Sequence, residues 1–246
     1  MEIVLPKKMP VSEKNLYEKN KHLNHYKTFK HIPKNVSSWD RVKWILKESG
    51  LPTLKLNIFV PYEDILSEEN QNKHLYVKHR GINSPGWKSM AIHGTAIEDT
   101  QPKEYYIEKG KYTKETCPNY GWTKLADKCP KTKIWLENLG FKYFERVRFM
   151  VLEPGGWIAS HADTNNRGIQ AWNVSITNPK GHVFCMDNYG YVPWEVGEMR
   201  GIDIGITHAV VNTSSEPRVH MIIHGNFGEK FCNTIITSYQ KFYEKN

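Results

Sequence analysis

The sequence predicts an α+β fold that is mainly β: a strand core closed as a jelly roll, with helices packed against it. From Tyr143 to about residue 227, short segments rich in β-branched and aromatic residues alternate with turn residues, as at 154–156, 178–181 and 188–190. Segments with helical spacing of apolar residues precede and follow this region. The 246 residues suffice for one large domain, and a closed jelly roll limits exposed sheet edges.

Helices and short strands are expected before the core. Asp40 suits the N-cap of a helix that stops at Gly50, with Val42 and Ile45 on one face. The elements expected in this part are a partly irregular arm at 1–36, a helix at 40–50, a strand at 54–60, a helix from 61 to about 66, short strand-like pieces over 75–122 and a helix at 132–140. After the core, residues 230–243 carry a single apolar stripe and predict a helix.

Three residues of the core have the side chains of a metal site. His161 and Asp163 are two positions apart, so on an extended segment both point to the same side. His208 lies near one end of a strand expected at 203–211, which can bring the third ligand. Two imidazoles and one carboxylate bind one face of a ferrous ion and leave positions open for a chelating co-substrate and for oxygen.

Arg218 follows His208 by ten residues and opens another expected strand, 217–224. A planar guanidinium binds a carboxylate bidentately, so this arginine suits the distal carboxylate of 2-oxoglutarate. Each feature also has a plain structural interpretation: His161 and Asp163 as a hydrogen-bonded loop pair, His208 as a core histidine, and Arg218 as a surface residue. Their joint order and spacing, among strands separated by turns, favour the metal site.

These residues resemble the aspartyl/asparaginyl β-hydroxylase-like branch of the iron(II)- and 2-oxoglutarate-dependent dioxygenases, whose core is a double-stranded β-helix of the jelly-roll or cupin type. The resemblance covers about residues 143–227. It rests on Pro-Gly-Gly at 154–156, on His161-Ala-Asp163, on the turn 194–198, and on His208 followed by Arg218. Asp163 departs from the animal enzyme that names the family, which lacks this carboxylate, and agrees with the wider superfamily.

The resemblance implies a role for each matching residue. His161, Asp163 and His208 would bind Fe(II), and Arg218 would anchor 2-oxoglutarate, with O2 as the second co-substrate. The strand after the first ligand offers Asn173 and Trp172 as further co-substrate contacts, where the named enzyme has basic and imidazole side chains. Because related halogenases replace the carboxylate with a small residue, Asp163 favours hydroxylation.

The extent of this resemblance, together with the lysine-rich composition of the first 36 residues, suggests how the chain is organised. Residues 37–246 would form a single catalytic domain behind a basic arm at 1–36. Within this domain, 37–142 would support the core and recognise the substrate, 143–227 would carry the metal site, and 228–246 would form the C-terminal helix.

Five residues are candidates for substrate binding. Arg148 lies on the strand before the first metal ligand, Arg167 lies on the loop after it, and His220 shares the face of Arg218. Trp87 and Trp122 belong to the part without a recognised match and could line the substrate pocket. Solvated arginines, a buried histidine and core tryptophans are the alternative interpretations of these residues.

Composition narrows the class of protein. No run of about 18 apolar residues occurs, mean hydropathy is -0.61, and the first ten residues lack the apolar core of a secretory signal. The cysteines at 117, 129, 185 and 232 form no Cys-x-x-Cys pair, which is typical of reduced thiols in a cytoplasmic protein without a membrane span. Residues 1–50 hold 11 Lys+Arg against 5 Asp+Glu, so the arm could meet nucleic acid, although a solvated face is the simpler interpretation.

Three functions therefore compete. The leading hypothesis is a dioxygenase that hydroxylates a C–H bond of an amino-acid side chain, free or in a peptide or protein, releasing succinate and CO2. The second keeps this chemistry but takes a nucleotide or nucleic-acid substrate through the basic arm. The third is a metal-binding jelly roll without catalytic activity.

Overall fold

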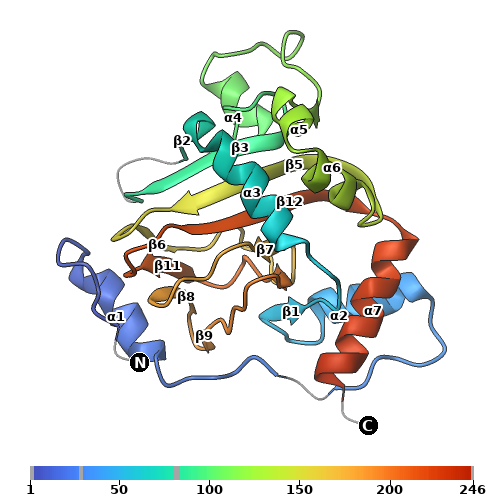
Figure 1. The fold of residues 1–246 in the computed structure, drawn as a ribbon. Coiled ribbons are helices and arrows are strands. Elements are labelled where there is room, and N and C mark those ends of the chain that lie inside the picture. The colour runs from blue at the N-terminus through green and yellow to red at the C-terminus, as the bar shows by residue number, and fades with distance from the viewer. Residues whose placement is uncertain (1–2, 28–29, 80–83, 245–246) are drawn as a thin grey trace.

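Two antiparallel β-sheets stack in the middle of the molecule, and most of the helices cover the outer face of the larger one (Figure 1). The computed structural model describes residues 3–27, 30–79 and 84–244. Apolar side chains of both sheets, such as Leu152 and Phe184, meet in a core between them. The predicted jelly roll, a mainly β double-stranded β-helix with flanking helices, is therefore confirmed.

The larger sheet has eight strands. Its order is β1-β10-β7-β12-β5-β3-β2, and the short β4 pairs with β3. The strands are β1 (Thr53–Lys55), β2 (Val77–Lys78), β3 (Trp87–Gly94), β4 (Gly121–Trp122), β5 (Phe141–Leu152), β7 (Ala171–Ser175), β10 (Met199–Ile202) and β12 (Arg218–Phe227). The smaller sheet has the order β6-β11-β8-β9. Its strands are β6 (Trp157–His161), β8 (His182–Met186), β9 (Gly190–Tyr191) and β11 (His208–Asn212).

The helices divide between the two outer faces. All but α1 and α4 contribute buried or partly buried residues to the core on the outer side of the larger sheet, while α1 packs on the smaller sheet. The helices are α1 (Val11–Asn20), α2 (Ser38–Lys47), α3 (Tyr62–Asn72), a 3-10 turn η1 (Lys73–Leu75), α4 (Lys103–Glu108), α5 (Lys124–Lys128), α6 (Pro130–Glu137) and α7 (Glu229–Tyr243).

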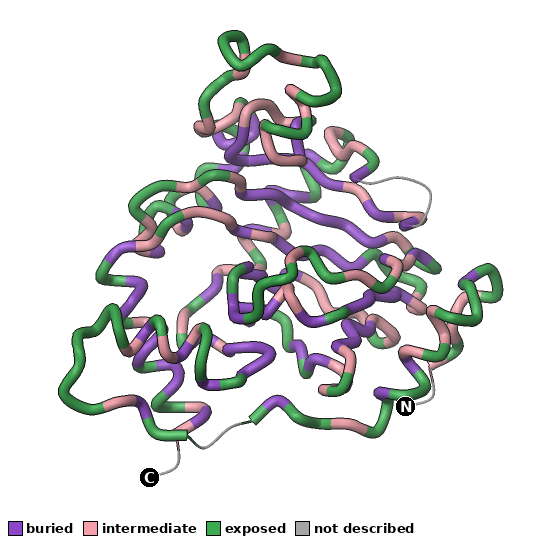
Figure 2. Tube along the Cα trace, turned by 180° about the vertical axis from the view of Figure 1, so that it is seen from behind, coloured by how far each residue is buried: buried purple, intermediate pink, exposed green. Residues whose placement is uncertain are grey.

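Alternation along the central strands separates two environments. On β12, Val219, Met221 and Ile223 join the core beneath the helices, whereas Arg218 and His220 point to the space between the sheets. The second half of β5 and the first half of β12 are almost entirely buried, and exposed residues concentrate on loops and outer helix faces (Figure 2). Arg148 and Arg218 are thus held inside the molecule.

Several elements differ in extent from the predictions. Helix α2 is capped by Ser37, whose hydroxyl accepts the Asp40 N–H, so the predicted Asp40 cap was wrong. The predicted strand 54–60 is shorter and spans Thr53–Lys55. The Leu56 N–H makes one more hydrogen bond, to the Met199 carbonyl oxygen, and the Asn57 N–H donates to the Ser238 hydroxyl of α7.

The strand expected at 203–211 is also shorter than predicted. The Asp203 carboxylate accepts the Gly205 N–H and forms a turn, so the strand starts only at His208.

The expected arm is more ordered than its composition suggests. Helix α1 buries Tyr17 against the outer face of the smaller sheet, together with Val183 and Val211. After the helix, the chain passes so close to the turn before β9 that a Cβ at Gly190 would collide with the carbonyl oxygen of Leu23. The arm is therefore a layer of the fold over the residues that the structure describes.

None of the helices in the described part of the chain combines the length and apolar character needed to cross a bilayer.

We expect Gly190→Ala to weaken the packing of the arm. A side chain there meets the Leu23 carbonyl and must adopt a positive φ of 107°, so the unfolding free energy should fall by about 2–4 kcal/mol. Gly155→Ala is the matched control, because it carries the same kind of strain (φ 71°) with open space around it, and should cost about 1 kcal/mol. Urea unfolding measures both; equal losses would contradict a tight contact.

Candidate active site

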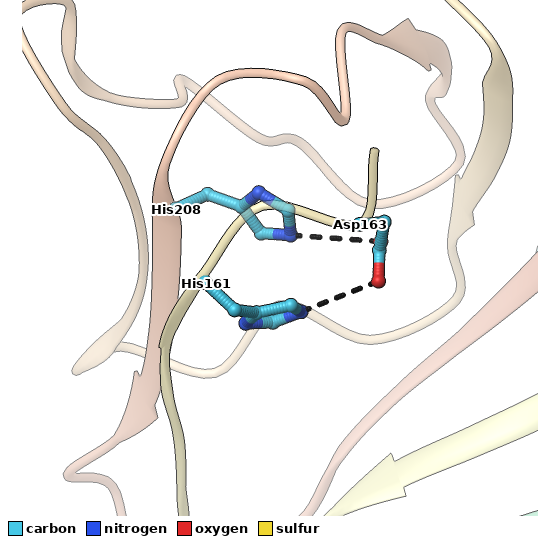
Figure 3. Close-up of side chains that lie close together, drawn as sticks. All are labelled: His161, Asp163 and His208. Carbon is cyan, nitrogen blue, oxygen red and sulfur yellow. Dashed lines mark ion pairs between the residues drawn. The ribbon is translucent and has the colours of Figure 1, made fainter. Parts of the chain in front are cut away.

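Three side chains converge at the open ends of strands β6 and β11. Register places His161 directly opposite His208, and Asp163 follows just after β6 ends. One ligand atom from each lies within 4.8 Å of the others. Both Nε2 atoms face the carboxylate, at 3.6 Å for His161 and 4.0 Å for His208 (Figure 3). These separations exceed those of hydrogen bonds and leave room for an ion bound to all three.

The orientation of both rings suits a metal. The Nδ1 of His161 lies 2.7 Å from the Ala159 carbonyl oxygen, and that of His208 lies 2.8 Å from the Ile206 carbonyl oxygen. Each Nδ1 therefore carries the proton and donates it, so that each Nε2 presents a lone pair toward Asp163. Two neutral imidazoles and a carboxylate are a suitable ligand set for Fe(II), so His161, His208 and Asp163 fit this ion.

Backbone contacts position the carboxylate. The Asp163 N–H donates to the Ile204 carbonyl oxygen at 2.9 Å, which ties the bend after β6 to the turn before β11. His208 is almost fully buried against the Phe184 ring, whereas the His161 and Asp163 side chains keep 26% and 33% of their surface exposed. Two of the three candidate ligands are thus partly open to solvent.

Arg218 is a buried cation without a carboxylate partner. Only 2% of its surface is exposed, and no Asp or Glu of the described residues lies within ion-pair distance. It donates to the Nδ1 of His220 and lies 6.0 Å from the centre of the Trp194 ring, but its Nε has no hydrogen-bond partner. Burial lowers the pKa of Arg218 to about 9. An anion bound here would restore the missing charge partner, as a carboxylate of 2-oxoglutarate would.

One cavity of about 360 Å³ joins the three candidate ligands to Arg218. Both sheets contribute to its wall, and the apolar part includes Ile158, Phe184 and Ile222. The structure brings together eight of the predicted site residues here: His161, Asp163, His208, Arg218, Asn173, Arg148, His220 and Trp87.

The cavity is strongly basic. Arg146, Arg148 and Arg218 line it, and Asp163 is the only carboxylate among its described lining residues. Arg148 donates to the Thr100 carbonyl oxygen at 2.6 Å and to the Nε2 of His224. Arg218 lies four positions before Ile222, the β12 residue paired with Arg148, so the backbone positions that carry the two arginines are about 13 Å apart along the sheet. They therefore define two separate cationic positions.

Three predicted site residues lie elsewhere. Trp172 points to the opposite side of β7 from Asn173 and packs against Phe231, because neighbouring strand residues face opposite ways. Trp122 packs edge-on against His93 at β4. Arg167 binds Asp203 at 2.8 Å on the molecular surface. None of these three contacts the cavity, so the structure gives no support to their predicted roles.

Two lining residues were missed or not assigned. His79 reaches the cavity from the chain after β2, with its Nδ1 2.6 Å from the Ser89 hydroxyl and its ring against Trp87. No local sequence pattern marks it, because β2 and β3 come together only in the folded sheet. The sequence does place His224 on the face of Arg218, at even spacing along β12, but assigns it no binding role.

Three histidines in and around the cavity are neutral: His220 is buried, and His182 and His224 are half-buried. Burial holds the pKa of His220 and of His182 well below the usual value, and the Arg218 guanidinium lowers both further. Burial, followed by the Arg148 guanidinium, does the same to the pKa of His224. The positive charge of the cavity therefore comes from its arginines.

Comparison with protein families identifies a family to which the chain is similar. The family model described as aspartyl/asparaginyl beta-hydroxylase matches residues 54–226, well over half of the chain. No curated protein sequence matches the chain.

Solved structures with a similar arrangement are distant. A viral collagen prolyl hydroxylase from Paramecium Bursaria Chlorella virus-1, a 2OG complex, has 16% identity and a TM-score of 0.41, with 71% of this chain and 95% of that chain covered. A Pseudomonas putida prolyl-4-hydroxylase has 12% identity and a TM-score of 0.43, with 77% and 100% covered. A Trichoplax adhaerens prolyl hydroxylase has 9% identity and a TM-score of 0.46, with 82% and 98% covered. Likenesses at this level carry no functional conclusion.

The lowered pKa values of these three histidines predict a loss of stability in acid. A histidine whose pKa is lower in the folded than in the unfolded chain takes up a proton on unfolding, so its stabilisation is complete above about pH 6.5 and declines below it. Each such histidine adds at most about 1.4 kcal/mol per pH unit to the slope.

His182→Asn should therefore flatten the dependence of the unfolding free energy on pH between about 6.5 and 4.5. The new amide can keep the hydrogen bond that the His182 Nδ1 makes to Asn178. His22→Asn, at an exposed position, is the control. Unfolding in urea across this range is the measurement, and an unchanged slope for His182→Asn would contradict its burial as a neutral group.

Proposed function

Since this chain belongs to the aspartyl/asparaginyl beta-hydroxylase family and is an iron(II)- and 2-oxoglutarate-dependent dioxygenase, we propose that it hydroxylates an acidic amino-acid side chain presented by a peptide or protein. The observation that carries the proposal is the pair of separate cationic positions in one cavity, one at Arg218 and one at Arg146 and Arg148. The co-substrate needs one of them. The other suits a carboxylate of the substrate.

In this proposal His161, Asp163 and His208 hold the iron. Their Nε2 and carboxylate atoms face one another, and the backbone hydrogen bonds of both Nδ1 atoms fix the ring orientation before any ion binds. Bound iron would supply, together with 2-oxoglutarate and O2, the oxidising chemistry that converts a C–H bond into an alcohol and 2-oxoglutarate into succinate and CO2. The protein's own residues bind and orient the reactants and exclude water.

Arg218 is proposed to hold the distal carboxylate of 2-oxoglutarate. Burial without a carboxylate partner makes the guanidinium a strong site for an anion, and the bond to His220 limits its rotation. Asn173 lines the cavity from β7, opposite Ile222, and can donate an amide hydrogen to the same ligand.

Arg148 and Arg146 are proposed to orient the substrate. The hydrogen bonds of Arg148 to Thr100 and His224 fix its guanidinium at the cavity wall, and Arg146 lines the cavity beside it. His220 and Trp87 supply further wall contacts. A carboxylate at this position would be held far enough from Arg218 to leave the co-substrate site free.

Other functions receive less support. A nucleic-acid substrate was suggested by the basic arm, but α1 packs on the smaller sheet and its Lys19 pairs with Asp187. A metal-binding module without activity would have no use for a buried, unpaired arginine in the same cavity. A reducing compartment such as the cytoplasm is part of the proposal, because the four cysteines are free thiols.

Measurements of iron binding and of 2-oxoglutarate binding should distinguish the proposed iron ligands from the proposed 2-oxoglutarate anchor. In anaerobic titrations, His161→Ala and Asp163→Ala should weaken Fe(II) binding by at least about 100-fold, because each removes one of three ligands. Arg218→Ala should keep the iron affinity but weaken 2-oxoglutarate binding by about 100-fold, which corresponds to about 2.7 kcal/mol. The visible absorption of the iron–2-oxoglutarate complex and calorimetry measure both affinities.

Arg167→Ala is the matched control for this titration, since it removes an arginine outside the cavity. It should change neither affinity. Normal binding of 2-oxoglutarate by Arg218→Ala would remove the co-substrate role of this residue, and normal iron binding by His161→Ala would remove the metal site.

Substrate choice should follow charge. In a peptide screen read by succinate formation, peptides with Asp or Glu should stimulate turnover above the same peptides with Leu. Arg146→Gln and Arg148→Gln should lower kcat/KM for the acidic peptide about 10- to 100-fold and leave the affinity for 2-oxoglutarate unchanged. Equal turnover of the acidic and the Leu peptides would refute an acidic substrate.

A further inference from the structure

Helix α1 makes a hydrogen-bonded contact to the residue that precedes a metal-binding histidine. The carboxylate of Glu13 accepts the Ser160 N–H at 2.7 Å and the Ser160 hydroxyl at 3.0 Å. Ser160 lies next to His161 on β6, an edge strand of the smaller sheet. A residue almost 150 positions away in the sequence thus holds the strand that brings the first ligand.

A single peptide group connects the two side chains. The group between Ala159 and Ser160 donates its N–H to Glu13, and its carbonyl oxygen accepts the Nδ1–H of His161. The order is therefore carboxylate, peptide, imidazole, with the Nε2 of the imidazole facing Asp163. Hydrogen bonds that share one peptide group polarise one another, so a negative charge at its N–H end makes its carbonyl oxygen a stronger acceptor.

We propose that Glu13 is a positioning residue of the metal site, which acts on His161 through this peptide group. The proposal rests on the metal-binding role of His161 proposed above. A stronger bond to Nδ1 fixes the ring orientation and makes Nε2 a better donor to a metal, as carboxylates bonded to metal-binding histidines do elsewhere. Glu13 thereby extends the site to the N-terminal arm.

The position of Glu13 is set by the other end of its helix. Asn20 is fully buried; its amide donates to Asp187 at 3.1 Å and its carbonyl oxygen accepts the Asn188 N–H at 2.7 Å. Lys19 pairs with Asp187 at 2.8 Å, and Tyr17, in the middle of the helix, is buried. Helix α1 is therefore held near both of its ends, and the contact of the Glu13 carboxylate with Ser160 belongs to a fixed part of the structure.

The test is the affinity for Co(II), a spectroscopic substitute for Fe(II), in the full-length protein. Glu13→Ala should weaken Co(II) binding about tenfold or more, within the range found for partners of metal-binding histidines. Glu13→Gln should have a smaller effect, because its amide oxygen still accepts one hydrogen bond but lacks the charge. The visible Co(II) spectrum should shift in Glu13→Ala, since the orientation of one ligand changes.

Two controls separate this role from a general effect of the arm. Glu18→Ala removes an exposed carboxylate of the same helix that pairs with Lys21. Lys19→Ala loosens the far end of the helix without touching Ser160. Both should keep the Co(II) affinity and spectrum of the unchanged protein, whatever they do to its melting temperature.

The outcomes are distinct. A Co(II) affinity of Glu13→Ala within twofold of the unchanged protein would overturn the proposal, even if the metal-free variant melts lower. Equal weakening in Lys19→Ala would overturn it too, because the effect would then belong to the arm as a whole. Failure of the unchanged protein to bind Co(II) would remove the proposed function itself.

Discussion

The strict alternation of side chains across β5, β7 and β12 is the constraint on which the rest of the structure depends. One face of these strands is apolar and carries the helices, and the other brings Arg146, Arg148, Arg218 and Asn173 into the space between the sheets. A shift of register by one residue would exchange the two faces and place guanidinium groups beneath the helices. The apolar packing of the helices therefore also determines where the cations of the cavity lie.

Burial of these cations has a cost that the fold leaves partly uncompensated. Arg218 has no carboxylate partner among the described residues, and its lowered pKa reflects the loss of water around it. The three histidines nearby are neutral and therefore add no positive charge beside the arginines. An anion that binds Arg218 supplies the missing charge partner, and so offsets part of the free energy that burial of the guanidinium cost during folding. Because the site is formed before the ligand binds, little of the binding free energy is lost in rearranging it.

The N-terminal arm contacts a strand that carries part of the candidate site, although the arm itself lies outside the cavity. Gly190 lets the chain after α1 approach the turn before β9, and Asn20 anchors the helix to that turn. Because α1 is fixed in this way, its Glu13 reaches the strand that carries His161, the first of the proposed metal ligands. The positive charge of the N-terminal arm suggested that it binds nucleic acid. In the structure, the arm instead contacts the smaller sheet and the turn before β9.

The sequence by itself determined the fold class, the strands around the site and the residues with metal-binding chemistry, because alternation and turn residues are local signals that survive in single segments. The type, order and spacing of His161, Asp163, His208 and Arg218 predict one site, and all four line the same cavity. Tertiary structure alone decided that Trp172 faces the helices, that His79 lines the cavity, and that Glu13 meets Ser160. These contacts join segments far apart in the chain, and their geometry depends on strand pairing and packing that no local pattern encodes.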